Sequence, residues 1–243
     1  MLWALLWFAL TCQSSYTDDD VPKSKRLPRT FLSQEYREPV LKPWLLPYQK
    51  WEKEYANYFR RHYKDASLTF KPTMIVMHYT VLDSAAEVYR FFVKGCTMSA
   101  GDFGYYHGHP SVQLMIDKDG TIFQLMPLDR RCTGAYGVNH VALSIEMVAR
   151  DEAALLSRPR QVWASFCLVR KLMRDYGIPL NKVVSHAEVG EGKTVVREYT
   201  DYCDSEWPDR YPPGSKRLDP GPTYMTWLRG YLTTHGPAPS PSP

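Results

Sequence analysis

The chain has 243 residues, of which 44% are hydrophobic and 23% are charged, and its formal net charge is +4 at pH 7. A chain of this length can bury a substantial core, and one domain with an extension is the natural expectation. The mildly basic charge comes without a dense run of Lys and Arg, which argues against a nucleic-acid partner.

The chain opens on an apolar segment, residues 1–15, which gives way abruptly to the acidic stretch 17–20. This segment is too short to span a bilayer and is typical of a signal-peptide core, although no Lys or Arg precedes it. We therefore expect a signal peptide at 1–15 and a secreted or periplasmic protein. A lipid anchor at Cys12 and an artefactual N-terminus are the alternatives. No other stretch is apolar enough for a membrane helix.

Residues 16–69 are expected to form an N-terminal arm and one helix. Residues 16–45 carry Asp, Lys, Arg and Pro with little periodicity, which indicates an extended arm or linker. From Pro47 the aromatic residues recur at helical spacing, which predicts an aromatic face packed on the domain. Carbohydrate binding by this face is the weaker alternative. The face comprises Tyr48, Trp51, Tyr55, Tyr58, Phe59 and Tyr63.

The run 73–80 is apolar and predicts a strand buried on both faces, with His78 near its end. Ser84 and Glu87 then form a capping-box pattern that predicts a helix through residue 92 or 94. The loop 95–110 is rich in Gly and aromatic residues, and we expect it to form a wall of a substrate groove. Its His107 and His109 are expected to be surface residues, with a second metal site as the alternative.

A Gly turn at 117–120 joins two apolar runs, 112–116 and 121–126, which predicts a hairpin. The run 141–148 predicts another buried strand, whose alternation places Glu146 and Ser144 on the face opposite Leu143. A carboxylate there must face water, a cation or a cavity, because burying it unpaired is costly.

The remainder predicts an amphipathic helix from Pro159 to Gly177, a short strand at 182–186, a charged insertion at 187–214 and a closing helix at 223–232. The Pro/Ser-rich tail, 233–243, is expected to be disordered. Apart from Cys12, the chain has four cysteines, which allow up to two disulfides in three pairings; free buried thiols are the equal alternative. These are Cys96, Cys132, Cys167 and Cys203.

Three polar residues stand where chain segments end. His78 and His186 each end a predicted strand, and Asp219 lies on the rigid turn 217–222. Two imidazoles and one carboxylate suit zinc, and three protein ligands leave the fourth position open, as in catalytic zinc sites.

Five motifs in order resemble the type 2 N-acetylmuramoyl-L-alanine amidases, which share their fold with the peptidoglycan recognition proteins and the phage amidase lysozymes. The resemblance covers 70–232, the expected amidase domain. The motifs are His78 at its strand end, the hairpin 111–124, the strand 139–147 with Glu146, the segment 184–186 with His186, and the Asp219 turn 219–222.

The resemblance implies that His78, His186 and Asp219 hold Zn²⁺ and that Glu146 is the catalytic acid and base. The family usually has Lys two residues before the metal-binding Asp, and Arg217 stands there. Arg217 can stabilise charge, but it cannot give up a proton. Gln113 replaces a frequent His, Val112 a Tyr of the phage enzymes, and 132–134 the Trp-His-Ala segment, which puts substrate preference and rate in question.

We therefore expect an α/β fold with a central mixed sheet flanked by helices and a zinc-containing groove. The expected activity is hydrolysis of the amide between N-acetylmuramic acid and L-alanine in peptidoglycan, by a monomer without a stable membrane span. A peptidoglycan-binding protein without catalysis is one alternative, and a zinc amidase acting on soluble muropeptides is the other.

Overall fold

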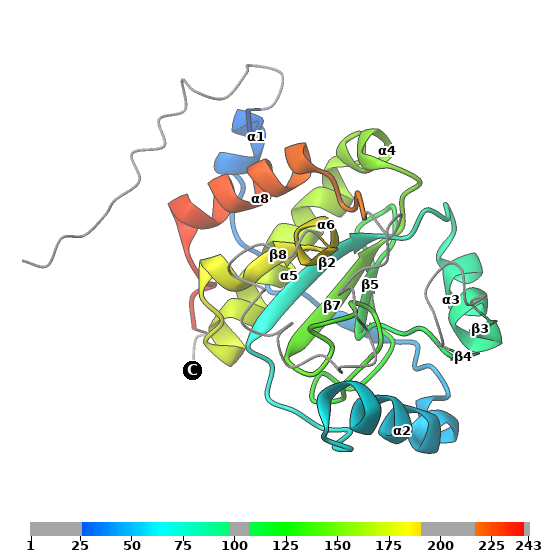
Figure 1. The fold of residues 1–243 in the computed structure, drawn as a ribbon. Coiled ribbons are helices and arrows are strands. Elements are labelled where there is room, and N and C mark those ends of the chain that lie inside the picture. Colours follow the sequence, from blue (N-terminus) through cyan, green and yellow to red (C-terminus); the bar gives the residue numbers. More distant parts are fainter. Residues whose placement is uncertain (1–25, 98–106, 191–216, 241–243) are drawn as a thin grey trace, which may run out of the picture.

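The computed structural model describes residues 26–97, 107–190 and 217–240, apart from the side chains of 96, 97, 107 and 108 (Figure 1). Its main sheet has the strand order β1-β6-β5-β7-β2-β8, in which only β5 and β6 are antiparallel neighbours. The expected mixed sheet flanked by helices is confirmed. Its strands are β1 (Leu41–Pro43), β2 (Met74–Tyr79), β5 (Leu114–Ile116), β6 (Ile122–Gln124), β7 (Ala142–Met147) and β8 (Val183–Ser185).

Short strands β3 (Cys96–Thr97) and β4 (His107–Gly108) form a separate antiparallel pair. The hairpin and the buried strands lie where the sequence predicts them, within two residues at each end. The helices are α1 (Arg29–Leu32), η3 (Tyr48–Trp51), α2 (Glu52–Tyr63), α3 (Ala85–Lys94), α4 (Glu152–Leu156), α5 (Pro159–Tyr176), η4 (Leu180–Lys182), α6 (His186–Gly190) and α8 (Pro222–His235).

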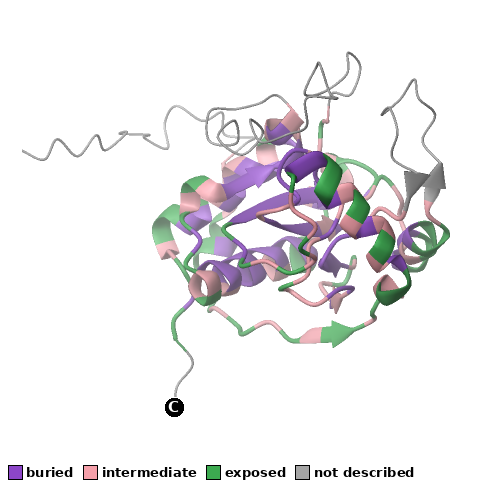
Figure 2. Ribbon diagram, turned by 60° about the horizontal axis from the view of Figure 1, so that its bottom comes forward, coloured by how far each residue is buried: buried purple, intermediate pink, exposed green. Residues whose placement is uncertain are grey.

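Alternation along the central strands gives the sheet two different faces. Leu143, Ile145 and Met147 of β7 join the core cluster that also contains residues of α5 and α8. Met74 and Val76 of β2 belong to a different cluster, with Val184 and the loop residue Val138. By the same alternation His78 and Glu146 stand on this second face, as expected for Glu146. Figure 2 shows the purple, buried strands at the centre of the molecule.

The aromatic stripe packs on the domain, as predicted. Trp51, Tyr55, Phe59 and Tyr63 are buried in a cluster with Val88 and Phe92 of α3. Ser84 precedes α3, but its side chain makes no capping hydrogen bond. The predicted helix is confirmed to Lys94, but without the capping hydrogen bond of Ser84; Ala85, Val88 and Phe92 are its buried side.

The described part of the predicted N-terminal arm, residues 26–45, is largely exposed, but it is anchored to the domain at Phe31 and β1. Phe31 is 3% exposed and lies against Phe166, Trp227 and Trp163, at ring-centroid distances of 5.5, 6.1 and 6.4 Å. β1 adds an edge strand to the sheet by pairing with β6. These partners lie between 81 residues (Leu41 to Ile122) and 196 residues (Phe31 to Trp227) away in the sequence, so local periodicity could not show them.

The expectation of a disordered tail is wrong for its described part, 233–240. α8 continues to His235, and Arg170 of α5 donates hydrogen bonds to the carbonyls of His235, Gly236 and Pro237. Ala238 is buried, and its N–H donates to the carbonyl of Arg170. One buried guanidinium therefore holds a Pro-rich segment that has no secondary structure of its own.

Several sequence expectations lie outside the described residues. These are the apolar segment 1–15 with Cys12, most of the loop 95–110, most of the insertion 187–214 and Cys203. Cys132 and Cys167 are buried free thiols, while the pairing of Cys96 and Cys203 stays open. Within the described ranges, no helix combines the length and apolarity needed to cross a membrane.

Replacing Phe31 by Ala should lower the free energy of unfolding by about 3–5 kcal/mol, because a large aromatic side chain leaves a packed cluster. Leu32→Ala is the matched control, since the Leu32 side chain is exposed and should cost little. Denaturant unfolding of both variants measures the difference. Equal stability of the two would mean that the segment around Phe31 does not contribute to the core.

Candidate metal centre

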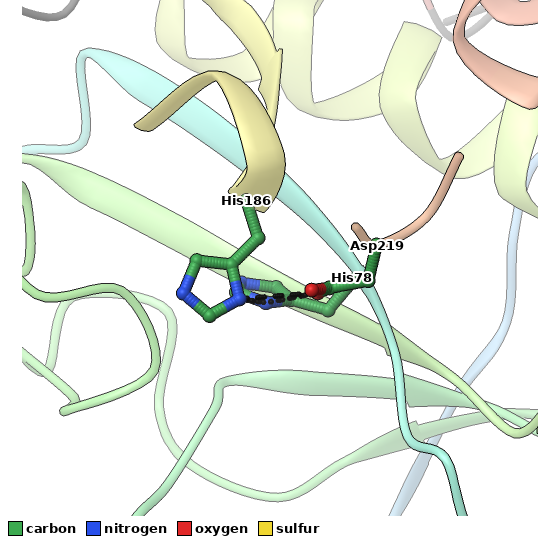
Figure 3. Close-up of side chains that lie close together, drawn as sticks. All are labelled: His78, His186 and Asp219. Atoms are coloured by element: carbon green, nitrogen blue, oxygen red, sulfur yellow. Dashed lines mark hydrogen bonds and ion pairs between the residues drawn. The ribbon is translucent and has the colours of Figure 1, made fainter. Parts of the chain in front are cut away.

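Three neighbouring parallel strands converge on the site. β2 is flanked by β7 and β8, and Met77 is in register with Ser185. The next residue in each chain segment is a histidine, so His78 and His186 lie side by side where the strands end. His186 also begins α6, and Asp219 reaches the same point from the turn before α8 (Figure 3).

The ligand atoms form a nearly equilateral triangle. His78 Nδ1 and His186 Nδ1 are 3.1 Å apart, and Asp219 Oδ2 is 3.3 Å from the first and 3.1 Å from the second. Two ligands at about 2.0–2.1 Å from a tetrahedral ion would stand roughly 3.3 Å apart. The spacing and the N₂O donor set therefore fit zinc, and within the described ranges no other group of His, Cys, Asp and Glu could hold a metal.

The electrostatics of the triangle favour a cation. Burial alone would raise the pKa of Asp219, but the charges and hydrogen bonds of His186 and His78 outweigh it and hold the pKa well below its usual range. The two imidazole nitrogens are close enough to repel each other unless a proton or a metal lies between them. An ion at the centre would satisfy all three side chains at once.

The Asp219 turn is fixed from both sides. The Asp219 carbonyl accepts a hydrogen bond from the N–H of Ala187, the residue after His186, at 3.0 Å. Gly221 has a φ of +102°, and a Cβ there would overlap with the carboxyl group of Glu152. Glu152 Oε1 in turn accepts from the N–H of Tyr224 at 2.8 Å. Glycine is therefore required at 221 for Glu152 to accept the hydrogen bond from the first turn of α8.

Glu146 is in register with His78 on the adjacent strand. Burial raises the pKa of its carboxyl from 4.5 to about 7; the charge of Asp219 adds to this rise, and His78 and Arg217 oppose it. Its Oε2 is buried and has no hydrogen-bond partner among the described residues. A buried carboxylate left in this state suits proton transfer near neutral pH better than a structural role.

Arg217 lies near enough for its charge to act on Glu146. The structure thus brings His78, His186, Asp219 and Glu146 together, with Arg217 within electrostatic range of Glu146.

Of the two histidines of the alternative second metal site, the side chain of His107 lies outside the described residues, and the ring of His109 is engaged by other partners. That ring stacks on Trp51 at a centroid distance of 4.1 Å and pairs with Glu54 at 3.0 Å.

The atypical hairpin residue Gln113 has a structural place inside the sheet. Its Nε2 donates to the carbonyl of Arg130 at 2.7 Å, and its Oε1 accepts from the N–H of Ser144 at 2.8 Å and from the thiol of Cys132 at 3.2 Å. Cys132 begins the segment 132–134, which stands in place of the family's Trp-His-Ala. The two positions at which the chain departs from the family pattern, Gln113 and this segment, are therefore hydrogen-bonded to each other.

A sequence model of the N-acetylmuramoyl-L-alanine amidase family matches residues 69–221. The chain belongs to this family. The matched range contains His78, Glu146, His186 and Asp219, together with Arg217.

Several solved structures resemble the chain. LysCS, an endolysin amidase from Clostridium intestinale, is 26% identical with a TM-score of 0.39, over 51% of this chain and 75% of that one. The PlyG catalytic domain is 18% identical with a TM-score of 0.43, over 66% and 95%. AmpDh3 from Pseudomonas aeruginosa, solved with anhydromuramic pentapeptide, is 19% identical with a TM-score of 0.38, over 49% and 52%. No relative among curated proteins matched the chain.

Sequence reasoning missed the residues that surround the site. Ser185 and Glu188 flank His186 in a Ser-x-x-Glu pattern, which is a visible helix-start signature. Glu152 and Arg229 gave no sequence signal, because their partners lie 72 and 41 residues away.

In the metal-free protein Glu146 should contribute a loss of stability as the pH rises through the range 4.5 to 7. His140, whose pKa burial lowers to about 4, contributes in the opposite direction, in the parent and in the Glu146 variant alike. The folded state holds a proton on Glu146 in this range that the unfolded state has already released, so raising the pH favours unfolding. Glu146→Gln should remove this loss, which amounts to roughly 1–3 kcal/mol. Melting curves of both proteins in chelator at pH 5 and pH 8 measure it. An identical pH response in the two would show that Glu146 titrates normally.

Proposed function

We propose that the protein is a zinc-dependent amidase that hydrolyses the bond between N-acetylmuramic acid and L-alanine in peptidoglycan. The observation that carries this proposal is the triangle of His78, His186 and Asp219 with the buried carboxyl of Glu146 beside it. Family membership supports the same bond and the same substrate class.

The residues present fit zinc, and His78, His186 and Asp219 would hold it. When bound, zinc supplies a Lewis acid that activates water at neutral pH and polarises the scissile carbonyl. The remaining chemistry belongs to side chains of this chain.

Glu146 is suited to move the proton. Water attacks the carbonyl carbon and loses a proton, which the Glu146 carboxylate accepts. The same proton is then given to the amide nitrogen as the carbon–nitrogen bond breaks, which leaves a carboxylic acid and a free amine. A carboxyl with a pKa between its ordinary 4.5 and about 7 can do both near neutral pH.

Arg217 would stabilise the negative charge that develops on the carbonyl oxygen. Its guanidinium is permanently charged, so it can act as an electrostatic clamp but not as the acid. Because the three ligand side chains would hold the metal and Arg217 keeps its proton, Glu146 is the candidate-site residue left to transfer a proton. The proposal includes export of the protein, which the apolar, signal-like segment 1–15 supports.

Purified protein incubated with intact peptidoglycan should release stem peptides that begin with L-alanine. Release should stop in chelator and return with added zinc, because three ligands without an ion cannot activate water. Mass spectrometry of the products identifies the bond that is cut. Muropeptide binding without products, in protein shown to contain zinc, would contradict the enzyme and favour a binding protein. Products from soluble muropeptides alone would mean that these, and not the polymer, are the substrate.

Glu146→Gln should lower the turnover rate by about 10²–10⁴-fold and leave zinc content unchanged, because it removes proton transfer and keeps the shape. Arg217→Ala should cost about 10²–10³-fold, and Arg217→Lys should recover much of this loss. Glu87→Gln on the exposed face of α3 is the matched control and should behave like the parent. Full activity of Glu146→Gln would assign the proton transfer to another group.

A further inference from the structure

A reciprocal pair of hydrogen bonds encloses His186. The N–H of Ser185 donates to Glu188 Oε2 at 2.8 Å, and the N–H of Glu188 donates to Ser185 Oγ at 3.0 Å. This is the capping-box geometry, with the histidine at the first helical position between its two members. The backbone that carries the imidazole is thereby fixed at the junction of β8 and α6.

Glu188 is itself held by a second element. Arg229 of α8 donates to Glu188 Oε1 at 2.9 Å and to Oε2 at 2.7 Å, and it also donates to the carbonyl of Val183 in β8 at 2.9 Å. A two-pronged guanidinium–carboxylate pair fixes direction as well as distance. The Glu188 carboxylate therefore cannot rotate away from Ser185 without losing both contacts to Arg229.

The same helix leads back to the third side chain of the triangle. α8 begins at Pro222, three residues after Asp219, and the Asp219 carbonyl accepts from Ala187 inside the capping box. The path from His186 through Glu188, Arg229 and α8 to Asp219 is therefore closed by a direct backbone hydrogen bond. Two of the three candidate ligands belong to one hydrogen-bonded unit.

We propose that Glu188 is a positioning residue for His186, and that Arg229 holds Glu188 in place, so that the His78–His186–Asp219 triangle is formed before a metal ion enters. This inference rests on the proposed zinc site and adds two residues outside the candidate ligand triangle. Groups behind metal ligands typically change metal affinity by about 10–100-fold when they are removed.

Glu188→Ala should weaken zinc binding by about 10–100-fold, because His186 loses its fixed direction. Glu188→Gln keeps an oxygen for the Ser185 N–H, since Gln also serves in capping boxes, and should bind zinc more tightly than the Ala variant. Arg229→Met keeps the capping box but loses the ion pair and the hydrogen bond to the Val183 carbonyl, so an intermediate affinity is expected. Competition with a chelating dye measures the zinc affinity of each protein.

Glu38→Ala is the matched control. The Glu38 carboxylate likewise pairs with a guanidinium: its Oε1 lies 2.8 Å from Arg174 Nη2 and 2.8 Å from Lys171 Nζ. These partners lie on α5 and not on α8. It should leave zinc affinity unchanged, whatever it does to stability. Melting of the metal-free proteins separates a loss of fold from a loss of positioning. If Glu188→Ala fails to fold, Glu188→Gln and Arg229→Met decide the question.

Parent-like zinc affinity in folded Glu188→Ala, or in both other variants, would overturn the positioning role. A parent protein that binds no zinc would overturn it together with the zinc site. A parent that binds zinc but releases no stem peptides would contradict the proposed amidase alone, and the ranking of affinities would still test the positioning role.

Discussion

The parallel pairing of β2 with β7 and β8 is the constraint on which the site depends. It places His78 opposite Glu146 and one residue beyond the pair formed by Met77 and Ser185. A slip of one residue in either pairing would turn the slipped strand's polar group to the face packed against α5 and α8. The apolar residues on that face, such as Ile75 and Ile145, therefore fix the register that brings the polar groups together.

The arrangement is unfavourable for the protein without an ion. Two imidazole nitrogens face each other at 3.1 Å, and Glu146 has a buried oxygen without a described partner. Such a group costs stability that an apolar residue would not. The surrounding hydrogen bonds offset part of this cost, because Ala187, Glu152 and Ser185 hold the backbone around Asp219 and His186. The pattern is that of a site shaped for a ligand and not of a packed core.

The sequence predicted the groups on the strands better than the contacts around them. His78, Glu146 and His186 stand at the ends or on the polar side of buried runs, so alternation alone gives their direction. Phe31 and Arg170 could not be found in this way. Phe31 depends on rings of α5 and α8, and Arg170 depends on main-chain carbonyls, which leave no trace in side-chain patterns. The capping box at Ser185 was visible in the sequence, whereas the one expected at Ser84 did not form.

The parts of the chain outside the family match have a physical relation to the site through α8. The match ends at residue 221, where this helix is about to begin. Phe31 of the N-terminal segment packs on Trp227, and two residues further along the same helix Arg229 holds Glu188. The tail after His235 is tied to Arg170 of α5, which closes the other end of the helix. The N-terminal segment thus packs on α8 near its middle, and Arg170 of α5 binds the carbonyls at its end. Because the same helix supplies Arg229 and begins just after Asp219, these contacts stabilise the element that joins two of the three candidate zinc ligands.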